Sequence, residues 1–159
     1  MKELEAAIKL RAEGKLKESN RLLINLVKEF PHKAQVNYQC AWSFDVLGLE
    51  REAIPYYEKA IELGLPEDDL KGAFLGLGST YRTLGEYEKS RDVFLKGLEV
   101  FPEDNAIKTF HAMTLYNLGD YSEAMKILLI NLAATSADEN IKQYEKAIRF
   151  YAEDLNKIW

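Results

Sequence analysis

Apolar residues along the chain recur at intervals of three and four positions, which places them on one face of an α-helix. The stretch of residues 70–84 carries such a face, formed by Leu70, Ala73, Phe74, Leu77, Tyr81 and Leu84. Similar stretches follow one another along the chain, separated by short segments that contain glycine or proline. The pattern predicts nine helices, at residues 2–13, 17–30, 34–47, 51–63, 67–84, 87–100, 104–118, 121–134 and 138–157. We therefore expect an all-α protein.

Glycines mark a repeat in this series of helices. They recur at spacings of 34, 37 and 34 residues, as Gly14, Gly48, Gly85 and Gly119. Each follows the first helix of a pair, where glycine can adopt the left-handed conformation that ends a helix. A proline follows the second helix of three pairs and cannot continue it. The chain therefore divides into four helix-turn-helix units with one helix left over.

The third unit carries a recognisable series of residues at fixed positions. It reads Phe74-x2-Leu77-Gly78-x2-Tyr81, followed by Gly85, Tyr87, Ser90, Phe94, Gly97 and Pro102. This series resembles the tetratricopeptide repeat, and the other units supply matching residues over roughly residues 1–136. The chain is also similar to a compact bacterial family of this repeat type that is known mainly by its fold. The resemblance implies a right-handed superhelix in a single domain, with units at about 1–33, 34–69, 70–104 and 105–137 and a capping helix at 138–159.

Composition narrows the classes of function. Hydrophobic residues make up 47% of the chain and charged residues 30%, which is typical of a folded protein. The net charge is −5 and no dense cluster of Lys and Arg is present, so we expect no nucleic-acid partner. No apolar run is long enough to cross a membrane, and the charged residues 1–5 lack the core of a signal peptide. We expect a cytoplasmic protein with no membrane partner.

Residues with catalytic chemistry are few. Cys40 and His111 occupy a repeat position that faces the interior of each unit, so we interpret both as core residues. Residues 76–80 resemble a phosphate-binding loop but lack the preceding strand and the lysine that such a loop needs. No group of His, Cys and Asp has the spacing of metal ligands. We predict no catalytic, cofactor or metal site and no enzyme activity; turnover abolished by Cys40→Ala or His111→Ala would contradict this.

The first helix of each unit directs three residues, spaced four and then three apart, into the groove of the expected superhelix. Aromatic and arginine side chains there are typical anchors of protein–protein interfaces. The predicted partner-binding residues are Arg11, Tyr38, Trp42, Asp45, Leu75, Ser79, Arg82, Met113 and Tyr116, with Phe150 from the capping helix. The alternative is that the aromatic rings fill the groove by packing against neighbouring helices.

Two glycines on one helix, Gly72 and Gly76, also admit two interpretations. They either open a shallow notch beside Arg82 for the backbone of a partner, or they permit close contact between helices.

The sequence favours an adaptor that holds a peptide or a helix in its groove. Trp42 and Tyr38 would bury their rings against the partner, and Arg82 and Arg11 would select its acidic residues. Lys and Asn residues that grip a C-terminal carboxylate in some tetratricopeptide proteins are missing here. Two alternatives stay open: a dedicated chaperone that escorts one unstable partner, and a homodimer formed through the capping helix and Trp159.

Overall fold

The computed structural model describes residues 1–159 and contains α-helices without strands. The helices are α1 (Lys2–Ala12), α2 (Leu16–Glu29), α3 (Ala34–Asp45), α4 (Glu50–Leu63), α5 (Glu67–Thr83), α6 (Tyr87–Val100), α7 (Asn105–Asn117), α8 (Tyr121–Thr135), α9 (Glu139–Gln143) and α10 (Glu145–Ala152). The first eight agree with the expected helices to within two residues at each end. The all-α prediction is confirmed.

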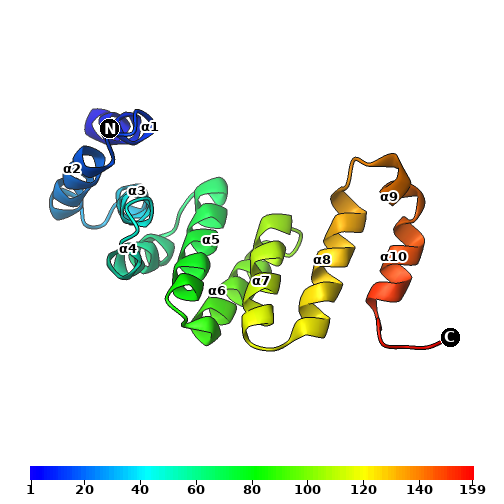
Figure 1. The fold of residues 1–159 in the computed structure, drawn as a ribbon. Coiled ribbons are helices and arrows are strands. Elements are labelled where there is room, and N and C mark those ends of the chain that lie inside the picture. The colour runs from blue at the N-terminus through cyan, green and yellow to red at the C-terminus, as the bar shows by residue number, and fades with distance from the viewer.

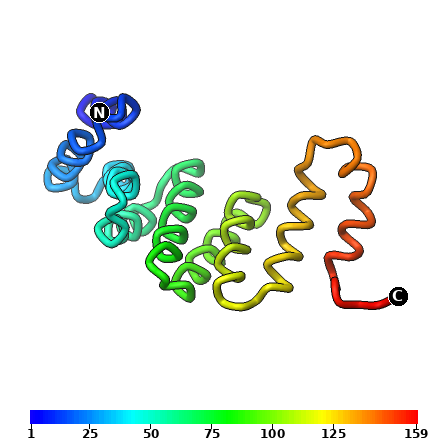
Figure 2. Tube along the Cα trace, viewed as in Figure 1, coloured from blue at the N-terminus to red at the C-terminus, as the bar shows by residue number.

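The helices form a row of antiparallel pairs, with the two ends of the chain at opposite ends of the row (Figure 1). The pairs are α1–α2, α3–α4, α5–α6 and α7–α8, and each second helix also contacts the first helix of the next pair. The first helices α1, α3, α5 and α7 contact one another in sequence. Figure 2 traces the resulting superhelical curve.

A glycine with a left-handed backbone conformation follows the end of each first helix. Gly14, Gly48, Gly85 and Gly119 have φ angles of 79°, 71°, 76° and 84°, a region that other residues rarely adopt. The predicted role of these glycines is confirmed.

Small residues allow the two helices of a pair to approach closely. In the third pair, a side chain at Gly78 of α5 would collide with the fully buried ring of Phe94 on α6. The Ser90 hydroxyl donates a 2.7 Å hydrogen bond to the Gly78 carbonyl, and Ser19 makes the same bond to Ala7 in the first pair. Side-chain size and one buried hydrogen bond thus fix the geometry of the pair.

The largest cluster of buried apolar residues lies in the first half of the row. A cluster of 14 buried residues extends from Ala7 to Tyr81, whereas two clusters of three buried residues each follow toward the C-terminus. None of the helices combines the length and the apolar composition of a membrane-spanning segment.

The expected capping helix at residues 138–157 is wrong in its form. It is divided at Tyr144 into α9 and α10, and no helix continues beyond Ala152. Of α10 only Ala152 is buried, and Leu155 and Ile158 are exposed. Short helices need tertiary contacts for stability, and α10 obtains them from α8.

Candidate functional site

The inner face of the row is lined by the first helices, and large apolar side chains are exposed on it. Trp42 of α3 is 42% exposed, Met113 of α7 is 36% exposed, and Tyr116 of α7 is 62% exposed. Neighbouring helices therefore leave part of the rings of Trp42 and Tyr116 uncovered. Their positions make the inner face the candidate functional site, which we call the groove.

The central hollow of the groove has a volume of about 420 Å³, within the range of ligand pockets. It brings together five of the predicted site residues from α3 and α5. The lining residues are Tyr38, Trp42, Asp45, Tyr57, Gly72, Leu75, Gly76, Ser79 and Phe110. Sequence reasoning missed Tyr57, which comes from the second helix α4, and Phe110 of α7.

Tyr38 lines this hollow but is only 8% exposed, so its expected exposure is wrong. Its hydroxyl lies directly over Gly72, where any side chain would collide with it. Gly76 is in similar contact with the ring of Tyr57, since a Cβ atom at this position would lie only 2.5 Å from the ring. The two glycines thus permit close packing of tyrosine rings, as the second interpretation predicted, although both also line the hollow.

Asp45 is partly buried at the junction of three helices. The Tyr57 hydroxyl of α4 donates a 2.5 Å hydrogen bond to Asp45 Oδ2, and the Thr80 hydroxyl of α5 donates a 2.9 Å bond to Oδ1. Burial raises the pKa of the Asp45 carboxyl, and the two hydrogen bonds oppose this rise because they stabilise the anion.

The two arginines of the groove bond to neutral groups. The Arg11 guanidinium lies over the Trp42 ring, 3.9 Å from its centroid, and Nη2 donates a 2.5 Å hydrogen bond to Gln39 Oε1. Arg82 Nε donates a 2.7 Å bond to Asn117 Oδ1. Neither arginine takes part in an ion pair, so both charges are free to meet an acidic group.

A second hollow of about 270 Å³ lies between α7 and α8. It joins Arg82, Met113 and Tyr116 to residues that sequence reasoning missed, namely Ala112, Tyr121, Ala124, Met125 and Leu128. Tyr121 and Tyr116 make an edge contact with ring centroids 5.0 Å apart. The spacing of Tyr121, Met125 and Leu128 on one face of α8 was the available signal.

Phe150 is not brought together with the other predicted residues. It lies on α10, which packs along α8, and its ring contacts Tyr151 and Trp159. The hollow beside it is lined by residues of α10 alone.

Cys40 and His111 lie in the interior, as the sequence predicted. Cys40 is fully buried, and burial raises the pKa of its thiol to about 12. Both ring nitrogens of His111 are buried without a hydrogen-bond partner, and burial together with Arg91 lowers its pKa. No three residues of the His, Cys, Asp and Glu types are grouped so that they could hold a metal ion.

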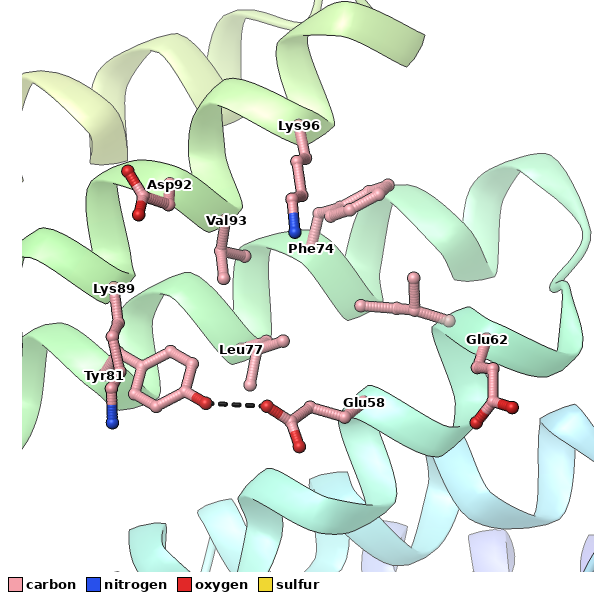
Figure 3. Close-up of a pocket in the computed structure, with 10 residues that line it drawn as sticks. Glu58, Glu62, Phe74, Leu77, Tyr81, Lys89, Asp92, Val93 and Lys96 are labelled. Atoms are coloured by element: carbon pink, nitrogen blue, oxygen red, sulfur yellow. Dashed lines mark hydrogen bonds between the residues drawn. The ribbon is translucent and has the colours of Figure 1, made fainter.

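A third hollow opens on the opposite face of α5, between α4 and α6 (Figure 3). The Tyr81 hydroxyl donates a 2.7 Å hydrogen bond to Glu58 across it, and Glu62, Asp92, Lys89 and Lys96 surround it. Three carboxylates and two ammonium groups line it, so charges of both signs are mixed there.

Fold and groove together define a helical-repeat protein that exposes apolar side chains on its inner face. The tetratrico peptide repeat family matches residues 33–155 of the chain, and the chain therefore belongs to this family. The tetratricopeptide fold generally mediates interactions between proteins and is generally non-catalytic.

Relatives of known identity share this repeat region. The chain is 28% identical to human aspartyl/asparaginyl beta-hydroxylase over 86% of its own length, and 36% identical to a TPR repeat-containing protein of Methanocaldococcus jannaschii over 62%. It spans only 19% of the length of either relative. The similarity to the hydroxylase thus extends over a minor part of that protein.

Among solved structures, YrrB, described as a TPR protein with an unusual peptide-binding site, superimposes with a TM-score of 0.72 at 18% identity. The superposition covers 98% of this chain and 77% of YrrB. At this identity the comparison shows a common fold.

Proposed function

We propose that the protein is a non-catalytic interaction module that holds an extended peptide, or a helix, of a partner protein in its groove. The observation that carries this proposal is the joint exposure of Trp42, Met113 and Tyr116 on one face beside two hollows. Exposed apolar patches of this kind mark interaction sites, and aromatic rings commonly anchor them.

The positive charges of the groove support the proposal that the partner peptide carries acidic residues. Arg11 and Arg82 lie on α1 and α5 and have no carboxylate partner within the chain. Each can therefore form a charge-assisted hydrogen bond with a carboxylate of the partner. The common fold with YrrB adds support for a peptide as the occupant.

Peptide selection tests this proposal. Random-sequence peptides displayed on phage are selected on the wild-type protein, and their affinities are measured by fluorescence anisotropy for the wild type, Trp42→Ala and Trp159→Ala. Burial of a large apolar side chain is worth about 1.5–3 kcal/mol, so Trp42→Ala should weaken binding about tenfold or more. Trp159→Ala is the matched control outside the groove and should leave the affinity unchanged. Equal binding to Trp42→Ala and the wild type would exclude the groove.

Self-association is a second candidate, favoured by the apolar side chains at the C-terminal end. The rings of Phe150 and Trp159 lie 4.7 Å apart, and Ile158 is 94% exposed. If these residues form a homodimer, light scattering should give a dimer mass for the wild type and a monomer mass for Trp159→Ser. A monomer mass for the wild type at high concentration would exclude this candidate.

A further inference from the structure

The carboxylate of Asp45 has hydrogen bonds but no positive partner. The hydroxyls of Tyr57 and Thr80 each donate to a different oxygen. A carboxylate offers about four acceptor directions, so about two stay available. None of the chain's twelve ion pairs includes Asp45.

A partly buried charge without a counter-ion is unfavourable. Desolvation disfavours the anion, and the charged neighbour that acts on Asp45, Glu50, has the same sign. Charged groups in protein interiors are generally paired because isolated charges lose much of their hydration energy. Arg11 does not supply the missing charge, since its guanidinium is bonded to Gln39 and lies on Trp42. A positive group from outside the chain would supply the missing charge.

The surroundings of Asp45 are suited to a positive group. The central hollow that Asp45 lines also carries the aromatic rings of Tyr38, Trp42, Tyr57 and Phe110. Aromatic rings attract cations through the negative potential of their faces. Gly72 and Gly76 contribute no side chains to the hollow, and Ser79 contributes a hydroxyl.

We propose that the central hollow receives the side chain of a lysine or an arginine from the bound peptide, whose positive group pairs with Asp45. This inference rests on the proposed peptide-binding function and adds a requirement on the sequence of the peptide.

The neighbouring repeats place a second requirement on the sequence of the bound peptide. Arg11 on α1, Asp45 on α3 and Arg82 on α5 occupy equivalent positions of successive first helices, so the unpaired charges alternate in sign along the groove. Packed helices lie about 8–10 Å apart, and a chain in the polyproline II conformation covers about 9 Å in three residues, one full turn that returns to the same face. A complementary peptide thus carries a basic residue with an acidic residue about three positions away on each side.

Two small probes test the hollow without any variant. N-acetyl-arginine amide carries the positive group, and N-acetyl-citrulline amide is its neutral isostere. Titration of the ¹⁵N-labelled protein at neutral pH and low salt should shift the amide signals of Gly76 and Ser79 and the indole signal of Trp42. The arginine probe should bind at least about tenfold more tightly than the citrulline probe, because only the charged probe pairs with Asp45. Equal binding of the two probes, or no saturable shift at these residues, would overturn the inference.

Asp45→Asn provides the matched variant. It keeps the size of the side chain and one acceptor oxygen but replaces the other oxygen by an NH2 donor and removes the charge, so the tenfold preference for arginine should disappear. Circular dichroism establishes whether the variant is folded, and the two wild-type titrations decide the question if it is not. A folded Asp45→Asn that keeps the preference would overturn the inference.

The phage-selected peptides separate this inference from the proposed function. Peptides that require Trp42 but contain no Lys or Arg would support the groove and overturn the pairing with Asp45. A selective arginine shift without any peptide dependent on Trp42 would support the cation site and remove the peptide-binding function.

Discussion

The guanidinium of Arg11 on α1 lies over the indole ring of Trp42 on α3, with 3.9 Å between the guanidinium carbon and the ring centroid. Together with the hydrogen bond from Arg11 to Gln39, this contact joins the first repeat to the second on the inner face. Arg11 therefore has a structural role in addition to any contact with a partner.

Removal of Arg11 should weaken the docking of α1. Arg11→Ala loses the contact with Trp42 and the bond to Gln39, and we expect the free energy of unfolding to fall by about 1–2 kcal/mol. Urea denaturation followed by circular dichroism measures this change. Arg21→Ala is the control, because Arg21 is exposed on α2 and forms no hydrogen bond or ion pair in the structure, and it should have little effect. Equal effects of the two variants would contradict the structural role of Arg11.

A side chain at Gly78 should disturb the third pair of helices. In Gly78→Ala the new methyl group meets the buried ring of Phe94, and we expect a net loss of about 1 kcal/mol or more, although alanine favours helices. Phe94→Leu removes the collision. In a double-mutant cycle, Gly78→Ala should therefore cost at least about 0.5 kcal/mol less in the Phe94→Leu background. Purely additive effects would rule out this contact as the cause.

The buried imidazole of His111 should make stability depend on pH. Its pKa is lowered in the folded protein, so below about pH 6.5 the unfolded chain binds a proton that the folded chain does not. Stability is therefore fully present above about pH 6.5 and falls as the pH decreases toward the folded-state pKa, by at most about 1.4 kcal/mol per pH unit for this group. Thermal unfolding between neutral and mildly acidic pH should show a smaller loss for His111→Leu than for the wild type. His32→Leu, which alters an exposed histidine, should keep the wild-type loss.

The thiol of Cys40 should be inert in the folded protein. It is fully buried, and a pKa raised to about 12 leaves almost no thiolate at neutral pH. Ellman's reagent should react with one thiol per chain in denaturing urea and with none in buffer. Rapid reaction in buffer would show that α3 opens readily or that Cys40 is accessible.

The helix pairs could be predicted from the sequence because the features that define them are local. Each first helix ends at a glycine, and the small and large packing residues recur at the same positions in each unit. Exposure of Trp42 and Tyr116 followed from their positions on the first helices.

The remaining features depend on residues far apart in the sequence. Tyr38 is buried because Gly72, 34 residues later, leaves room for its hydroxyl. The environment of Asp45 comes from Tyr57 and Thr80 on two other helices. The break at Tyr144 gave no signal in the sequence, since the apolar residues of 138–157 alone favoured one continuous helix.

The row of helix pairs has a consequence for the way the molecule opens. All substantial contacts join helices that are at most two apart in the sequence, so no contact fastens one end of the row to the other. Local openings in such an array begin at its ends and spread inward one pair at a time. Amide protons of α10, which packs on α8, and of α9, which contacts α10, should therefore exchange with solvent fastest, while those of α3 and α4, within the largest core, should persist longest.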